Sequence, residues 1–322
     1  MGKLLKHIER INEWNKKGST LPIMINIDLT NRCNNMCPRC IRTSNSGASI
    51  SLNDAKKIIL QLKSAGVKSL GLGGGGDPTC NPDFAKILYF AKQQEIETGV
   101  YTNGYMLKDS VIKAIIQCCT YVRISLDADS PESYFKTHGM SEKAYNAVLN
   151  NIKRLVQTKN EMQSDITIGI GILIDKKTNI NTYAATKMCK ELGVDYVRFR
   201  PFFNEAITNL NVSDCTNLAN EKFTVSFTQD RKKKREYGKC FVTQFTLTIS
   251  ADQKVYPCCH LSNNARYCIG DLKTESFKKI WDKKDKVLNT INLKDCPEIC
   301  VLDSANKLLW GIKQPLQHEN FL

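Results

Sequence analysis

Three cysteines stand close together near the beginning of the chain. Cys33, Cys37 and Cys40 form a C-x3-C-x2-C pattern directly after an apolar, strand-like run at residues 23–29. Three thiolates on one short loop can bind three irons of a [4Fe–4S] cube, which leaves the fourth iron open to a substrate or cofactor. Zinc is the competing interpretation, but a structural zinc ion needs four closed ligands, and no nearby His or Cys completes such a set. The pattern therefore favours an iron–sulfur cluster with one accessible iron.

Glycines and polar residues that could bind a cofactor stand at the ends of three further strand-like runs. Gly73–Gly76 is an unbroken glycine run, followed by Asp77. Glycine permits positive φ and a close approach of the backbone to a ligand. Asn103 follows the next run, and Ser125 and Asp127 alternate with apolar residues in the one after that, so both should face the same side of their strand.

The arrangement of these residues depends on a repeated strand–helix pattern. From residue 21 to about residue 203, strand-like runs alternate with helix-like runs, which predicts an α/β fold with a parallel sheet. A capping pattern at Ser51 and Asp54 predicts where the first helix begins. In a barrel of such units, the carboxyl ends of the strands share one face, where barrel enzymes have their sites. The six expected strands are residues 23–29, 69–72, 97–101, 121–126, 166–174 and 196–200.

These segments, in this order, resemble those of the radical S-adenosylmethionine (SAM) enzymes. The resemblance implies a partial (β/α)6 TIM-like barrel in which Cys33, Cys37 and Cys40 hold a SAM-binding [4Fe–4S] cluster. It also implies a reductant such as flavodoxin or ferredoxin, and cleavage of SAM to a 5′-deoxyadenosyl radical that abstracts hydrogen from substrate carbon. Asp77 stands in place of the family's Glu, and Arg39 stands where an aromatic residue is common. The residues that the resemblance implies in SAM binding are Gly74, Gly75, Gly76, Asp77, Asn103, Ser125 and Asp127.

The cysteine-rich end of the chain resembles the SPASM/twitch extension of the same family. This resemblance implies an auxiliary [4Fe–4S] cluster in a small C-terminal α+β region, since the chain lacks the denser cysteine pattern of a full SPASM domain. A structural zinc site on the same four ligands is the alternative. The implied ligands are Cys240, Cys258, Cys296 and Cys300, with Cys259 as the alternative to Cys258. The expected organisation is an N-terminal amphipathic helix (1–20), the barrel (21–203), a bridge (204–236) and the auxiliary cluster region (237–322).

The composition is that of a basic globular protein. Of the 322 residues, 42% are hydrophobic and 24% charged, and the net charge of +14 favours an anionic or polar small-molecule substrate. No apolar run approaches the roughly 20 residues that cross a bilayer, so no membrane partner is expected. Clustered cysteines without a targeting segment favour a cytoplasmic location. The basic run at 231–235 is interpreted as a solvated linker, so nucleic acid is not an expected partner, although the charge is compatible with one.

A cluster with four protein ligands cannot bind SAM, so its expected task is electron transfer. The expected reaction is therefore a two-electron oxidation of a polar small molecule, such as a sugar, cyclitol or nucleotide derivative. The short segment ahead of Cys33 leaves no room for a leader-binding domain, which makes peptide or protein modification the alternative. A non-catalytic iron–sulfur or zinc protein is the third hypothesis. No catalytic acid or base stands out; His138 and His260 are the candidates, although a lone histidine is more often structural.

Overall fold

One curved, mostly parallel sheet organises the molecule. The computed structural model describes residues 2–40, 46–175, 180–202, 212–228, 235–262, 264–297 and 300–315. The sheet has ten strands in the order β10-β9-β8-β1-β2-β3-β4-β5-β6-β7, and every neighbouring pair from β8 to β7 is parallel. The first six strands are β1 Met24–Ile27, β2 Ser69–Leu72, β3 Glu97–Thr102, β4 Tyr121–Ser125, β5 Thr167–Ile174 and β6 Tyr196–Pro201. All six strands predicted from the sequence are present, and the α/β barrel-like fold class is confirmed.

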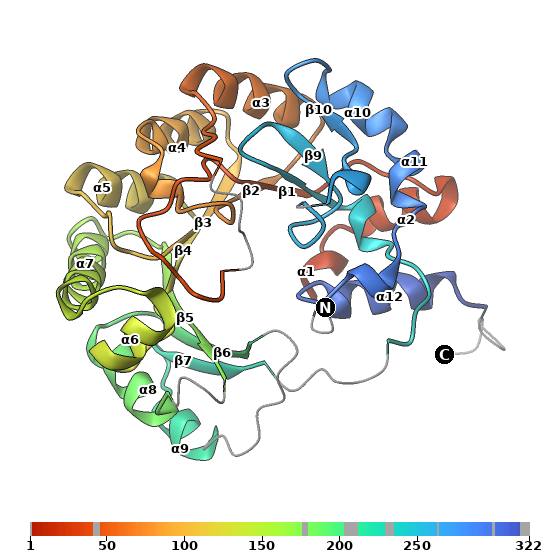
Figure 1. Cartoon of the computed structure of the whole chain (residues 1–322). Helices are drawn as coiled ribbons and strands as arrows, with labels where there is room; N and C mark the ends of the chain where they lie inside the picture. Colours follow the sequence, from red (N-terminus) through yellow and green to blue (C-terminus); the bar gives the residue numbers. More distant parts are fainter. Residues whose placement is uncertain are drawn as a thin grey trace.

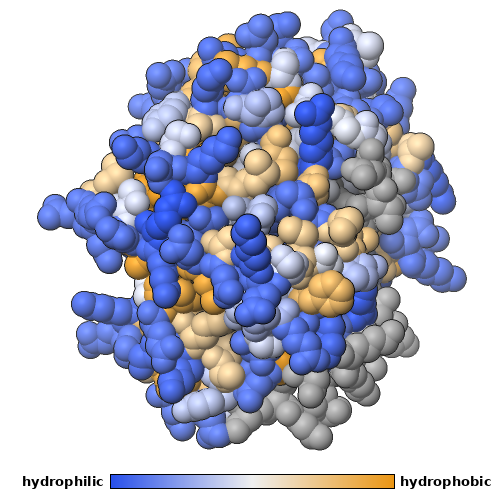
Figure 2. Space-filling view, turned by 60° about the vertical axis from the view of Figure 1, so that its left-hand side comes forward, coloured by the Kyte–Doolittle hydropathy of each residue, from blue (hydrophilic) through white to orange (hydrophobic). Residues whose placement is uncertain are grey.

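Helices cover the outer face of the sheet, as Figure 1 shows. They are α3 Leu52–Ser64, α4 Phe84–Gln93, α5 Asp109–Cys118, α6 Pro131–His138, α7 Glu142–Glu161 and α8 Thr182–Glu191. The side chain of Ser51 caps α3 by accepting a hydrogen bond from the Asp54 N–H, as the capping pattern predicted. The outward face of these helices is mostly hydrophilic (Figure 2), so the hydrophobic core lies between the helices and the sheet.

The two faces of each strand carry different residues. On β4, Val122 and Ile124 are fully buried in the core beneath the helices. The intervening Tyr121, Arg123 and Ser125 are only partly buried, because successive side chains of a strand point to opposite faces. The concave side of the sheet is therefore lined by polar side chains, which is the side on which a substrate could be held.

The stretch between the barrel and the cysteine-rich region contains structure that the sequence pattern did not predict. Helix α9 Val212–Asn217 and strand β7 Thr224–Phe227 lie within it, and β7 extends the sheet in parallel with β6. Residues 231–234 of the basic run at 231–235 lie outside the described residues. Arg235 donates hydrogen bonds to the carbonyl oxygens of Leu293 and Pro297, so this member of the run is a structural residue.

The cysteine-rich region shares its sheet with the barrel. Strand β8 Thr246–Ile249 pairs in parallel with β1 and forms an antiparallel pair with β9 Lys254–Tyr256. Helix α2 Ile8–Lys17, near the start of the chain, places Trp14 with its ring centre 5.2 Å from that of Phe241. The remaining elements of this region are α1 Gly2–Leu5, β10 Gly270–Asp271, α10 Phe277–Lys283, α11 Asp285–Leu288 and α12 Asp303–Lys313.

Within the described residues, no helix is long and apolar enough to cross a membrane.

Candidate functional site

The first three cysteines lie on the loop that leaves β1 at the carboxyl edge of the sheet. Cys33 and Cys40 are exposed and Cys37 is half-buried. Burial and, to a smaller extent, the neighbouring Cys33 and Cys40 thiols raise the pKa of the Cys37 thiol to about 12, so the three sulfurs lie near one another. No group of three or more His, Cys, Asp or Glu side chains among the described residues is placed to hold a single metal ion. A [4Fe–4S] cube does not need its thiolates to converge on a single metal ion, because each thiolate binds a different iron. Three clustered thiols on an exposed loop therefore fit a cube.

The glycine run holds this loop in place through its backbone. Gly76 N–H donates to the Thr30 carbonyl at 2.7 Å, and Asp77 N–H donates to the Arg32 carbonyl at 3.0 Å. A Cβ atom on Gly76 would lie 2.0 Å from the Arg32 carbonyl oxygen, so only glycine permits this approach. The predicted glycine segment therefore lies directly against the segment that precedes Cys33.

Asp77 joins the glycine segment to the end of β3. Its carboxylate is buried and accepts hydrogen bonds from the backbone N–H of Thr79 and Asn103 and from the hydroxyl of Thr102. Burial raises the pKa of Asp77, whereas these hydrogen bonds lower it. Both carboxylate oxygens are engaged inside the protein, which gives Asp77 a positioning task in this structure.

Asn103 faces the cysteine loop. Its side-chain nitrogen lies 3.8 Å from Cys33 Sγ and donates to Asn34 Oδ1 at 3.1 Å. The Cys80 thiol donates to the same Asn34 oxygen at 3.5 Å, so Cys80 is half-buried next to this loop. Amide donors near a ligating sulfur are among the features that set the reduction potential of an iron–sulfur cluster.

His138 holds the loop from the opposite side. Its Nδ1 lies 3.2 Å from Cys37 Sγ and its Nε2 lies 3.0 Å from the Leu126 carbonyl oxygen. The Met36 N–H donates to the His138 carbonyl at 3.1 Å, and Gly139, at φ +65°, passes so close that a Cβ atom would lie 2.6 Å from the Met36 oxygen. His138 is 4% exposed, so this candidate acid or base contacts a cysteine ligand rather than open space.

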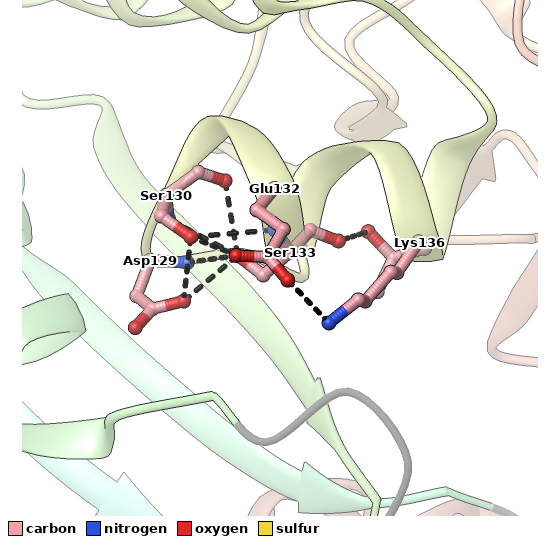
Figure 3. A network of polar contacts seen from close by, with 6 residues as sticks. Asp129, Ser130, Glu132, Ser133 and Lys136 are labelled. Atoms are coloured by element: carbon pink, nitrogen blue, oxygen red, sulfur yellow. Dashed lines mark hydrogen bonds and ion pairs between the residues drawn. The ribbon is translucent and has the colours of Figure 1, made fainter.

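A polar cap fixes the helix that carries His138. Figure 3 shows Asp129, Ser130 and Ser133 at the start of α6. Ser133 Oγ donates to Asp129 Oδ1 at 2.7 Å and accepts from the Ser130 N–H at 3.0 Å, and the Ser130 side chain caps the Ser133 N–H in return. Pro131 occupies the first helical turn, where its missing N–H costs nothing. The cap determines where α6 begins and thus where its last residue, His138, meets the cysteine loop.

Ser125 is the last residue of β4, as expected, but Asp127 lies two residues beyond the strand, so the expected alternation stops before it. Asp127 has a left-handed backbone, φ +45°, and its Oδ1 accepts a hydrogen bond from the Leu173 N–H on β5. Burial raises its pKa, although His138, Arg200 and Arg123 lower it. Across the site, Arg39 pairs with Asp175, and its guanidinium lies 3.5 Å from the ring centre of Phe202. Arg39 stands at the sequence position where the family commonly has an aromatic residue. The ring of Phe202 lies beside Arg39 instead.

The four predicted auxiliary ligands also come together. Burial and, to a smaller extent, the nearby Cys300 and Cys296 thiols raise the pKa of Cys240 to about 12. Burial also raises the Cys258 pKa, with Cys259 and Cys240 as neighbours, while the backbone N–H groups of Leu261 and His260 lower it. Cys268, by contrast, donates to the Gly270 carbonyl. Four clustered thiols with backbone donors nearby fit an iron–sulfur cluster that has no open iron.

Comparison with known proteins agrees with both cysteine sets. The radical SAM superfamily model matches residues 27–180, and the iron–sulfur cluster-binding SPASM model matches residues 240–301. The chain belongs to the radical SAM superfamily. The chain also carries a C-terminal SPASM domain. Its cofactors are therefore a [4Fe–4S] cluster, SAM and auxiliary iron–sulfur clusters.

The relatives act on different substrates. The chain is 24% identical to a probable GTP 3′,8-cyclase of Saccharolobus islandicus over 54% of each protein, so it spans about half the length of that curated relative. It is 22% identical to a tungsten-containing aldehyde ferredoxin oxidoreductase cofactor-modifying protein of Pyrococcus furiosus over 79% of each protein. Among solved structures, Streptococcus suis SuiB bound to the precursor peptide SuiA matches 89% of this chain and 70% of SuiB, with a TM-score of 0.68 and 16% identity. The last similarity shows the fold alone.

Proposed function

We propose that this chain is a radical SAM oxidoreductase that removes two electrons from a polar small molecule, such as a sugar, cyclitol or nucleotide derivative. The observation that carries the proposal is that Cys240, Cys258, Cys296 and Cys300 are half-buried and lie near enough to affect one another's pKa. A cluster with four protein ligands has no free iron for SAM, which suits it to accept an electron.

The first cysteine loop is the proposed site of the SAM-binding cluster, held by Cys33, Cys37 and Cys40. When bound, the two clusters and SAM supply a hydrogen-abstracting radical and an electron acceptor, so that the substrate loses one hydrogen atom, one electron and one proton overall. The chain's own part is placement. The backbone of Gly74–Gly76 is proposed to bind the SAM amino group. The Ser125 hydroxyl, which has no hydrogen-bond partner in the described part of the chain, is proposed to bind the SAM ribose.

The side chains on the concave side of the sheet favour a small polar substrate. This side presents tyrosine and arginine side chains from β3, β4 and β6, including Tyr101, Arg123 and Arg200. The GTP cyclase relative indicates that a nucleotide derivative is compatible with this core. A reductant such as flavodoxin or ferredoxin would deliver the first electron. A second candidate, modification of a peptide, is supported by the likeness to SuiB with its bound precursor peptide.

The test is an anaerobic iron count combined with product analysis. The reconstituted protein should hold about eight irons and form 5′-deoxyadenosine from SAM after reduction with dithionite. Replacing Cys33, Cys37 and Cys40 by Ala should abolish the product and leave about four irons. Replacing Cys240 and Cys258 should remove the other four, while Cys268→Ser serves as the matched control with full iron. About four irons in the parent protein would remove the proposed electron acceptor and with it the oxidase assignment.

A further inference from the structure

Three arginines project into the concave side of the sheet below the cysteine loop. Arg123 lies on β4 between the buried Val122 and Ile124, and on β6 Arg198 and Arg200 flank the buried Phe199. Because strand side chains alternate, these arginines share the face that carries Ser125. Arg123 precedes Ser125 by two residues, which places it about 7 Å deeper along the strand.

The strand between the arginines leaves room for them. Gly171 on β5 pairs with Ser125 on one side and Arg198 on the other, and Leu173 pairs with Arg200. A Cβ atom on Gly171 would lie 3.4 Å from Arg123 Cδ, so the Arg123 side chain lies across this glycine. Arg123 also lies with its guanidinium 4.4 Å from the centre of the Tyr101 ring, and the hydroxyls of Tyr101 and Tyr121 are hydrogen-bonded to each other. Tyrosines therefore flank the arginines on the β3 side of the interior.

The positive charge here is only partly balanced, by the carboxylate of Asp127. In the part of the chain that the structure describes, Arg123 and Arg200 make no ion pair or hydrogen bond, and the Nε of each is buried without a partner. Arg198 differs, since it contacts Thr228 Oγ1 at 3.3 Å. Asp127 is the carboxylate that acts on Arg200, and burial together with Arg123 outweighs it, so the pKa of Arg200 is lowered to about 10. Partly buried guanidinium groups whose charge is not fully balanced are costly to fold, which indicates that an anion completes the site.

The geometry points to an oxyanion subsite: Arg123 and Arg200 bind a phosphate or carboxylate group of the substrate inside the barrel. Guanidinium groups match both oxyanions with paired N–H donors. This inference rests on the proposed function and narrows its substrate to an anionic small molecule. The carboxylate of SAM is the other possible source of the same chemistry, and the experiment separates the two.

The experiment measures binding of pyrophosphate, succinate and SAM to the reconstituted protein under anaerobic conditions. The variants are Arg123→Gln and Arg200→Gln, and the exposed Arg266→Gln is the matched control. Each interior variant should weaken pyrophosphate or succinate binding about tenfold or more, as expected when a charged hydrogen-bond partner is lost. Iron content and SAM affinity should stay at the parent value in both variants, and Arg266→Gln should match the parent throughout.

Three results would overturn the inference. The first is a parent protein that binds neither anion at millimolar concentration. The second is a loss of SAM affinity in the variants, which would assign the arginines to the SAM carboxylate. The third is a marked loss of thermal stability in both variants, which would make the arginines structural, because removal of an unbalanced buried charge should not destabilise the fold. None of these measurements requires turnover, so a failure of the proposed oxidation leaves them interpretable.

Discussion

The contact between the glycine segment and the cysteine loop predicts the effect of Gly76→Ala. The added Cβ atom would lie 2.0 Å from the Arg32 oxygen, 2.5 Å from the Arg32 carbonyl carbon and 2.7 Å from the Asn31 carbonyl carbon. All three atoms are backbone, so no side chain can turn aside, and the two segments must separate. Separation breaks the hydrogen bonds from Gly76 to Thr30 and from Asp77 to Arg32. At about 0.5–1.5 kcal/mol each, their loss costs about 1–3 kcal/mol.

The assay for Gly76→Ala is thermal unfolding combined with an iron count after reconstitution. The melting temperature should fall by about 1.5–4.5 °C, and iron at the first cluster should fall because the loop that carries its ligands has lost its support. Gly311→Ala is the matched control, because nothing lies within 4 Å of its added Cβ atom and it stands in helix α12. Alanine there should leave stability unchanged or raise it by up to about 1 kcal/mol. A Gly76→Ala protein with parental melting temperature and full iron would refute the reasoning.

Three further changes test other contacts. Trp14→Ala should lower the free energy of unfolding by about 3–5 kcal/mol, because the ring is buried against Phe241; a loss below about 1 kcal/mol in a denaturant titration would contradict this packing. Thr20→Val removes the hydroxyl that donates to Glu13 at 2.8 Å and that contributes most to lowering the Glu13 pKa. A carboxyl group whose pKa is lower in the folded chain stabilises the fold at pH values above its pKa in the unfolded chain, so the variant should lose up to about 1 kcal/mol at pH 7. In unfolding measured on the metal-free chain, the difference should shrink as the pH falls through the lowered pKa of Glu13. Asp77→Glu, although Glu is common in the family, should cost about 1–3 kcal/mol of unfolding free energy, because the extra methylene enters a filled, buried site; equal or greater stability would show that the site has spare room.

The repeating strands were accessible from the sequence because their signal is local. The runs at Ser69–Leu72 and Thr167–Ile174 are apolar, short and bounded by helix-like segments. The pattern did not identify β7, because Thr224–Phe227 has no strongly apolar face and no buried residue. Nor did it place β8 beside β1, since this pairing joins Met24 to Thr246 and no local preference encodes such a contact.

In the candidate site, too, local features could be predicted from the sequence and long-range contacts could not. The cysteine spacing and the place of Ser125 on its strand were readable because residues a few positions apart lie on one loop or one strand. The expected alternation does not reach Asp127, whose left-handed backbone lies beyond β4. The contact of His138 with Cys37 joins residues 101 positions apart, so only the fold reveals it. The interior arginines could have been found: Arg198 and Arg200 flank the apolar Phe199 in a strand, which is the pattern that was used for Ser125 and Asp127.

The pairing of β8 with β1 has a consequence for how the molecule is made. About 220 positions separate Met24 from Thr246, so at about 5–20 residues per second the ribosome delivers β8 roughly 10–45 s after β1. During that interval one edge of β1 has unpaired N–H and C=O groups, which are prone to join strands of other chains. A cluster inserted early would rest on this half-supported strand. Stable metallation of the first cysteine loop is therefore expected to follow translation of the second cysteine-rich region.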